Sequence, residues 1–243
     1  MNVTKILDPS SGVLVSTVVD KTVAAISHNW QQGRPAHVVL TGGRTGTQMA
    51  QTLDTEIFRL VTSNEFLHRP ELNIWFSDER FTDLSDEART DSKLIASFSK
   101  TVELNQISVH FHRTSSPAQM SLNEAADAYA AELESQLGEK RFDAVLLSMG
   151  EDGHIASLFP GLATTAHSTK MAVAVDNSPK PPAERVSISV DRLANSSAIY
   201  IFALGEGKRE ALVNFLTHNV GPVALLQEGA TFGQMVIATD LRI

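Results

Sequence analysis

Cysteine is absent from the 243 residues of this sequence. Its absence excludes disulfides, thiolate nucleophiles and cysteine-ligated metal sites, and it favours a reducing, cytoplasmic setting. The sequence also lacks an apolar run of membrane-spanning length. Residues 1–12 lack the basic and then apolar pattern of a signal peptide. We therefore expect a cytoplasmic protein with no membrane partner.

Positive charge is scarce, because 20 Lys and Arg residues face 28 Asp and Glu residues and give a formal net charge of −8. Nucleic-acid binding would need a basic stripe, and none is visible, so we expect no nucleic-acid partner. The negative balance repels anions at long range, so any phosphate site requires a local cluster of cations. The hydrophobic fraction of 42% supplies one substantial core, and we expect residues 1–243 to form a single domain, as a monomer or a small homo-oligomer.

Apolar runs typical of buried strands alternate along the sequence with segments whose apolar residues recur at helical spacing. The expected strands cover residues 2–7, 36–40, 72–76, 107–111, 142–147, 171–175, 186–190, 199–204 and 235–239. The expected helices cover residues 13–30, a stretch from the turn at Thr47 to about Val61, 85–98, 122–137, a stretch from Lys208 to about Leu216, and 223–227. This alternation favours an α/β fold with a mostly parallel sheet and helices on both faces.

Residues 142–161, FDAVLLSMGEDGHIASLFPG, join an apolar strand to a charged turn. Gly153 allows the turn to be tight, and the residues after His154 predict a short helix that Pro160 ends. Asp152 and His154 thus follow the carboxyl end of a strand, where open α/β sheets bind ligands. A histidine there can exchange a proton near neutral pH while the carboxylate fixes its tautomer. The alternative is a surface turn in which the histidine caps a helix.

The strand at residues 36–40 leads into TGGRTGT, residues 41–47, at the start of a predicted helix. Free backbone N–H groups and the helix dipole favour a phosphate at such a turn. The segment matches neither the GxxxxGK[ST] loop nor the GxGxxG fingerprint, so a plain turn stays open as the alternative.

Three further segments place cations near strand ends. Asp78-Glu79-Arg80 ends a predicted strand, and an arginine can hold a phosphate or carboxylate bidentately, although three adjacent charges are also typical of a solvated loop. SPKPPAER, residues 178–185, is typical of a rigid connection and carries two cations. Lys208 lies in a first helical turn, where the dipole disfavours a cation unless that cation binds an anion.

Two other features suggest chemistry less strongly. His110 and His112 lie on one face of a strand and would suit a metal, but no third ligand with recognisable spacing accompanies them. We therefore favour an exposed strand end. Ser148 is not in a GxSxG elbow, which disfavours a serine-nucleophile hydrolase.

Three of the motifs, GEDGHIASLFPG, WFSDER and SPKPPAER, closely resemble signatures of the 6-phosphogluconolactonases, which belong to a sugar-phosphate group with the glucosamine-6-phosphate deaminases. The resemblance covers nearly the whole chain. It implies a Rossmann-like fold of the sugar-phosphate isomerase type with a few extra strands. The implied reaction is hydrolysis of 6-phospho-D-glucono-1,5-lactone to 6-phospho-D-gluconate, in the oxidative branch of the pentose phosphate pathway. The sequence departs from the family pattern at Arg44, at Gly46 and at Ser92-Lys93, where the family tends to have Ser-Asn.

The resemblance also implies residue roles. His154 would activate water, Asp152 would orient the imidazole, and Arg80 or Lys180 would stabilise the oxyanion. The implied substrate-binding residues are Gly42, Gly43, Thr45, Asp78, Arg80, Lys180, Arg185 and Lys208, with Arg185 and Lys208 holding the phosphate at the 41–47 turn. The reaction so implied requires no metal, no other cofactor and no covalent intermediate.

Two rival functions stay open. A glucosamine-6-phosphate deaminase resembles the chain through the Asp-Gly-His turn, but it continues toward Asn-Glu-Pro where Phe159 stands here, and it tends to have Tyr in place of Arg80. A non-catalytic sugar-phosphate sensor on the same fold normally carries a helix-turn-helix segment, whereas this sequence begins directly with its first predicted strand.

Overall fold

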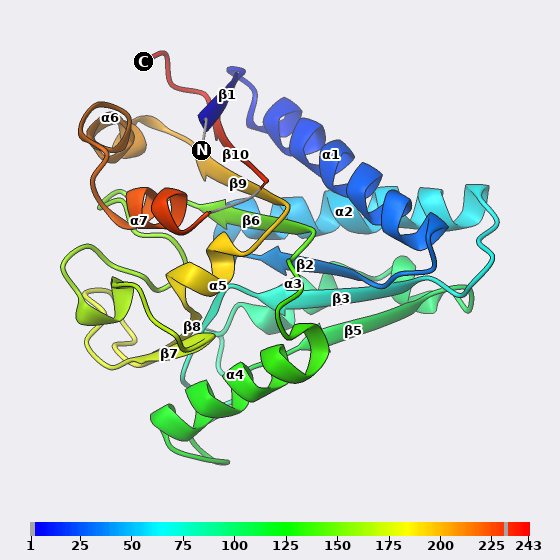
Figure 1. Cartoon of the computed structure of the whole chain (residues 1–243), viewed down its shortest axis with the longest axis horizontal. Coiled ribbons are helices and arrows are strands. Elements are labelled where there is room, and N and C mark those ends of the chain that lie inside the picture. Colours follow the sequence, from blue (N-terminus) through cyan, green and yellow to red (C-terminus); the bar gives the residue numbers. More distant parts are fainter. Residues whose placement is uncertain (1–2, 231–232) are drawn as a thin grey trace.

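A computed structural model describes residues 3–230 and 233–243, which form two sheets with helices around the larger one (Figure 1). The larger sheet has seven strands in the order β1-β10-β9-β6-β2-β3-β5, and every neighbouring pair in it is parallel. Its strands are β1 (Val3–Leu7), β2 (Ala36–Leu40), β3 (Glu71–Phe76), β5 (Ser108–His112), β6 (Ala144–Ser148), β9 (Ala198–Ala203) and β10 (Gln234–Thr239). The predicted α/β fold with a mostly parallel sheet is confirmed.

The smaller sheet is antiparallel, in the order β4-β8-β7. Its strands are β4 (Asp78–Arg80), β8 (Arg185–Ile188) and β7 (Ala172–Val175). The sequence predicted β7 and β8 but not β4, which contains the three adjacent charges. Pairing of β4 with β8 sets Arg80 opposite Arg185, so two motifs a hundred residues apart in the sequence lie on neighbouring strands.

Helices cover both faces of the larger sheet. One core contains Val38 and Leu40 of β2 with apolar residues of α1 (Ser11–Gln31), α2 (Gly43–Ser63) and α3 (Asp91–Ala96). The other contains Val39 with residues of α4 (Leu122–Leu137), α5 (Val190–Ala194), α6 (Arg209–His218) and α7 (Pro222–Gly229). Successive residues of one strand thus feed opposite cores, as a sheet buried on both faces requires. Short 3₁₀ helices cover Thr101–Glu103 (η1), Ala163–Thr165 (η2) and Glu206–Lys208 (η3).

The order of the strands reverses between β2 and β6. The chain runs from β2 outward to β3 and β5, then returns to place β6 on the other side of β2 and continues outward to β9 and β10. The loops that leave β2 and β6 therefore diverge in opposite directions, and ligands of open α/β sheets bind in the crevice at such a point. The Gly42-Gly43 turn follows β2 and the Asp152–His154 turn follows β6.

The predicted helix at residues 85–98 is shortened to α3, Asp91–Ala96. A buried carboxylate explains where it begins, because Glu79 accepts hydrogen bonds from the backbone N–H groups of Thr90 (2.9 Å) and Asp91 (2.6 Å). Arg89 is also buried, and its Nη2 donates to Asp91 Oδ2 at 2.6 Å. These tertiary contacts hold residues 81–90 in turns, against the helical preference of their sequence.

The short helix predicted after His154 is also wrong. Ile155 and Leu158 form an isolated antiparallel bridge, and Ala156 between them has a φ of 50°. His154 therefore does not cap a helix, and the segment is a folded loop. The first strand was predicted from Asn2, which lies outside the described residues, and β1 begins at Val3.

His37 occupies a buried position in β2. Its Nδ1 accepts a hydrogen bond from the Trp75 indole Nε1–H at 3.2 Å, and the residue is 6% exposed. Burial lowers the pKa of His37 to about 4, with the charges of His112, Lys140 and Arg192 acting in the same direction. The ring is therefore neutral in the folded protein, while it protonates readily in the unfolded chain.

Folding stability should depend on pH through His37. Because the pKa of His37 is about 4 in the folded protein against an ordinary 6.5, the unfolded state binds more protons between these values. The free energy of unfolding should fall as the pH drops through this window, by up to about 3 kcal/mol from this residue. The variant His37→Asn keeps an acceptor for Trp75 and does not titrate. In urea unfolding at several pH values, its stability should fall less steeply than wild type, and parallel curves would contradict the prediction.

Candidate active site

A cavity of about 210 Å³ lies where β2 and β6 diverge. The turn after β2, the end of β6, strand β4 and the loops that carry the predicted cations all contribute to it. Its lining residues are Thr41, Gly42, Gly43, Asp78, Arg80, Thr90, Ser148, Met149, Gly150, His154, Ala156, Lys180, Arg185 and Lys208. The fold thus brings most of the predicted site residues together.

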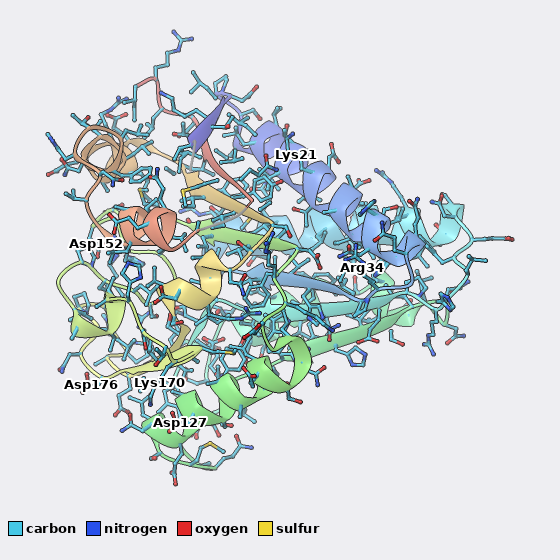
Figure 2. The ribbon with its side chains drawn as sticks, in the orientation of Figure 1. Lys21, Arg34, Asp127, Asp152, Lys170 and Asp176 are labelled. Atoms are coloured by element: carbon cyan, nitrogen blue, oxygen red, sulfur yellow. The ribbon has the colours of Figure 1, made fainter. Side chains whose placement is uncertain are left out.

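The Asp152–His154 pair lies at one wall of this cavity. Asp152 is labelled on the left in Figure 2, and the arrows of β6 and β9 in Figure 1 point toward the same side. His154 Nδ1 lies 2.5 Å from Asp152 Oδ1. A carboxylate can only accept a hydrogen bond, so Nδ1 carries the proton. The other ring nitrogen, Nε2, makes no hydrogen bond within the described parts of the chain, and His154 lines the cavity. The pair therefore presents Nε2 as a proton acceptor.

A tight turn holds the pair. Gly153 has a φ of 84°, a left-handed conformation that glycine adopts readily, and it forms the tight turn that the sequence predicted. The Gly150 N–H donates to the His154 carbonyl at 2.7 Å, and the Gly153 N–H donates to the Gly150 carbonyl at 3.1 Å. A side chain at Gly150 has no space, because its Cβ would lie 2.0 Å from His154 Nδ1. These bonds hold His154 in the turn, with Gly150 packed closely against its imidazole.

Electrostatics keep the imidazole neutral. Burial lowers the pKa of His154; the hydrogen bond and charge of Asp152 oppose this shift, and the charge of Lys180 adds to it. Burial raises the pKa of Asp152, but the hydrogen bond from His154 and the charge of Lys180 outweigh it and leave that pKa below its ordinary value. At neutral pH the pair is therefore a carboxylate and a neutral imidazole, the state that a general base requires.

Lys180 and Phe159 complete the surroundings of the imidazole. The ammonium of Lys180 lies 3.2 Å from His154 Nδ1 and 3.4 Å from Asp152 Oδ1, so it can donate only to the carboxylate. The ring of Phe159 packs against the imidazole with 4.5 Å between ring centroids. The imidazole is therefore in contact with both an apolar ring and a cation.

The Gly-Gly turn and Lys208 lie on the part of the cavity next to α2. Gly42 is the N-cap of α2 and makes no side-chain cap, so the first N–H groups of the helix remain available for an anion. Gly46 lies so close to the turn that a Cβ there would be 1.9 Å from the Thr41 carbonyl oxygen. Lys208 ends η3 and faces both this cavity and a neighbouring hollow.

Thr45 does not line the cavity. It lies in the neighbouring hollow of about 430 Å³, together with Arg44. The two hollows share Gly42, Gly43, Ser148 and Lys208. Arg44 therefore faces a hollow that adjoins the Gly-Gly turn.

Strand β4 explains why the three adjacent charges differ in environment. Side chains alternate along a strand, so Asp78 and Arg80 face the cavity while Glu79 between them is 1% exposed. Asp78 accepts hydrogen bonds from the Ser157 hydroxyl (2.6 Å) and the Ser77 hydroxyl (2.9 Å). Arg80 Nη1 donates to the Ala88 carbonyl at 2.5 Å.

Sequence reasoning missed two polar residues of the site. Thr90 lines the cavity, whereas Ser92 and Lys93 do not, and the Lys93 ammonium donates instead to the Glu87 carbonyl. Ser157 is fully buried, and its hydroxyl donates to Asp78, which lines the cavity. Its place in the motif ASLFP was the only signal for it, whereas nothing in the local sequence distinguished Thr90.

The two histidines of β5 have separate environments. His112 is 7% exposed and stacks on Trp75, so the exposed strand end expected for it is wrong, whereas His110 is exposed. The two ring nitrogens of His112 lie 2.6 Å from Glu132 Oε1 and 2.9 Å from Asn73 Oδ1. Within residues 3–230 and 233–243, no group of three or more His, Asp or Glu residues is arranged to hold a metal ion.

Comparison with known proteins decides the family. A family model described as glucosamine-6-phosphate isomerases/6-phosphogluconolactonase matches residues 9–236. The chain belongs to this family. The 6-phosphogluconolactonase of Mycobacterium tuberculosis is 29% identical over 227 residues, which cover 91% of this chain and 89% of that protein. The 6-phosphogluconolactonase of Streptomyces coelicolor is 31% identical over 75% of this chain and 70% of its own length.

Solved structures of the family share the fold. The 6-phosphogluconolactonase of Trypanosoma brucei matches with a TM-score of 0.78 and 20% identity, over 98% of this chain and 96% of that one. The protein from Thermotoga maritima matches with a TM-score of 0.74 and 22% identity, over 98% and 99% of the two chains. In the part of this family member that the structure describes, no helix has the length and apolarity needed to cross a membrane.

Replacing Asp152 should lower the basicity of His154. The carboxylate raises the pKa of the imidazole against the effect of burial, so Asp152→Asn should lower that pKa further below 6.5. Titration of the His154 ring resonances by NMR measures the shift directly. The matched control is Asp176→Asn on an exposed loop, which should leave the His154 titration unchanged. A raised pKa in Asp152→Asn would show that the carboxylate does not stabilise the imidazolium.

Proposed function

We propose that this protein hydrolyses 6-phospho-D-glucono-1,5-lactone to 6-phospho-D-gluconate, with His154 as the general base. The observation that carries the proposal is the neutral, carboxylate-oriented imidazole in the same cavity as a helix N-terminus and several cations. Its named relatives are 6-phosphogluconolactonases, which supports the choice of substrate. A lactone is already electrophilic, so a positioned base and an oxyanion site suffice.

The first step is attack of water on C1 of the lactone. Nε2 of His154 takes a proton from the water as the new C–O bond forms, a contribution of roughly 10² to 10⁴ in rate. Asp152 holds the Nδ1–H and stabilises the imidazolium that results. The imidazolium then returns the proton to the ring oxygen as the bond from C1 to that oxygen breaks. The product is an open-chain acid, which ionises in water.

Negative charge develops on the carbonyl oxygen of C1 during this step. Arg80 and Lys180 line the cavity and would supply N–H donors for it. Lys180 lies close to the imidazole, which would place the reacting carbon at this end of the cavity. Asp78, whose carboxylate faces the cavity, would accept a hydrogen bond from a sugar hydroxyl.

The phosphate would bind at the other end, on the Gly42-Gly43 turn and Lys208. Backbone N–H groups at the start of α2 and a lysine point charge are a combination suited to a phosphate dianion. Arg44 lines the adjoining hollow and would add to the positive potential there, and Thr45 beside it would offer a hydroxyl group. Holding the phosphate in this way positions C1 near His154 and lowers the entropic cost of the reaction.

The test is hydrolysis of freshly prepared lactone, measured as acid release above the spontaneous rate. His154→Gln should lower kcat roughly 10² to 10⁴-fold while the protein remains folded. The pH profile of kcat/KM for wild type should rise to a plateau through a pKa below 6.5, because the base must be unprotonated. Equal rates for wild type and variant, both above background, would remove His154 from the mechanism. Release of ammonia from glucosamine 6-phosphate would instead favour the deaminase.

Gly150→Ala should disable the site without changing any reacting group. The added Cβ would lie 2.0 Å from His154 Nδ1 and 2.5 Å from Asp152 Oδ1, so the pair must move. A displacement of this size should lower kcat by roughly a hundredfold. Gly12→Ala is the matched control, since its Cβ would meet only Ser10 and Gln48 side-chain atoms at 3.7 Å or more. Full activity of Gly150→Ala would show that the turn tolerates a different geometry.

A further inference from the structure

Arg185 is a cation of the cavity whose hydrogen-bonding groups are already engaged. The residue is 4% exposed at the start of β8. Its Nε donates to the Pro182 carbonyl at 3.1 Å, and its Nη2 donates to the carbonyls of Lys180 (2.9 Å) and Pro181 (3.3 Å). Its Nη1 makes a longer contact of 3.5 Å with the Ser157 hydroxyl.

These contacts leave few N–H donors of Arg185 to bind a phosphate. A guanidinium has five N–H donors in a planar fork, and its strength as a phosphate ligand comes from two parallel N–H groups. The contacts with protein use the Nε–H, both Nη2–H groups and one Nη1–H, so a single Nη1–H remains. Bidentate binding of an anion would require Arg185 to release the carbonyls of the 178–183 turn.

The turn that Arg185 holds carries Lys180. Ser178 closes this turn, because its N–H donates to the Ala183 carbonyl at 3.0 Å and its hydroxyl donates to the Lys180 carbonyl at 2.9 Å. The Lys180 carbonyl therefore accepts from both Ser178 and Arg185, which fixes the backbone of the lysine. From this backbone the ammonium reaches 3.2 Å from His154 Nδ1.

Other neighbours of Arg185 also hold its guanidinium in place. Burial lowers the pKa of its guanidinium, and the charge of Asp78 opposes this shift. The Ser157 hydroxyl bridges the two, since it donates to Asp78 and lies beside Arg185 Nη1. The guanidinium carbon also lies 5.7 Å from the ring centroid of Phe159, the residue that packs against His154.

We propose that Arg185 is a positioning residue that clamps the 178–183 turn and so holds the Lys180 ammonium beside Asp152 and His154. In this proposal the phosphate binds to the Gly42-Gly43 turn and Lys208, and not to Arg185. This inference rests on the proposed function, and it departs from the phosphate-binding role that the family resemblance implied for Arg185.

The test compares Arg185→Lys with two other variants in lactone hydrolysis. Lysine keeps the charge but cannot span three carbonyls, so Arg185→Lys should lower kcat roughly tenfold to a hundredfold. Inorganic phosphate should inhibit it with a constant within about twofold of wild type, whereas Lys208→Gln should raise that constant about tenfold. The matched control is Arg192→Lys, another buried arginine, which donates to the Lys140 carbonyl away from the cavity and should leave kcat unchanged. A phosphate constant raised as far in Arg185→Lys as in Lys208→Gln would overturn the proposal.

A double-variant cycle tests whether Arg185 acts through Lys180. The double variant Arg185→Lys, Lys180→Gln should be about as active as Lys180→Gln alone. Arg185→Lys displaces the Lys180 ammonium from Asp152 and His154, and Lys180→Gln deletes it, so the two changes remove the same contact. The acid limb of the kcat/KM profile should move to higher pH in both single variants, since Lys180 lowers the pKa of His154. Independent, multiplicative losses of kcat would overturn the proposal.

A measurement on wild type covers the case in which Arg185→Lys does not fold. The Arg185 Nε–H, bonded to the Pro182 carbonyl, should give an NMR signal protected from exchange that stays in place as phosphate saturates the protein. A large shift of this signal would overturn the proposal. Absence of lactone hydrolysis by wild type would instead refute the proposed function, while the NMR result would still report on the clamp.

Discussion

The reversal of strand order between β2 and β6 is the constraint on which the site depends. The chain leaves β2 toward one edge of the sheet and β6 toward the other, so the Gly42-Gly43 turn and the Asp152–His154 turn border one crevice. The antiparallel pairing of β4 with β8 then brings Arg80 and Arg185 to the same cavity. No single segment contains the site. The proposed base His154, the Gly42-Gly43 turn and two strand-borne cations converge only because the sheet has this topology.

Charge in the cavity is opposite to that of the molecule as a whole. The sequence carries a net charge of −8, yet Arg80, Lys180, Arg185 and Lys208 line one cavity of about 210 Å³. This local excess serves two purposes that do not conflict. Under the proposed function it attracts an anionic substrate, and through Lys180 it opposes protonation of the imidazole. Burial acts on His154 in the same direction, and Asp152 sets its tautomer. Burial therefore keeps the imidazole neutral with the help of Lys180, one of the cations that would bind the lactone.

Sequence patterns predicted what depends on local chemistry. Strand β2 and helix α4 have the predicted bounds, because a buried apolar run and a helix with the Ser121–Glu124 capping box are both encoded locally. The turn at Gly153 was predicted for the same reason. The motifs also indicated most of the charged lining. Strand β4, Thr90 and the burial of His112 could not be predicted, since each depends on a distant partner: β8, Glu79 and Trp75 respectively.

A cluster of buried charges at the start of α3 fixes the irregular segment 81–90 beside the cavity. Arg89 and Asp91 are paired with no exposed side-chain surface, and Arg113 joins them at 2.9 Å. Such a cluster contributes little net stability, because desolvation offsets the attraction between the charges. Its effect is on geometry. The Glu79 carboxylate accepts from the N–H groups of Thr90 and Asp91 and so fixes an irregular stretch of backbone. Arg80 and Thr90, at the two ends of this stretch, both line the cavity. The cluster therefore gives residues 81–90 one conformation, and with it a defined position for the Arg80 guanidinium.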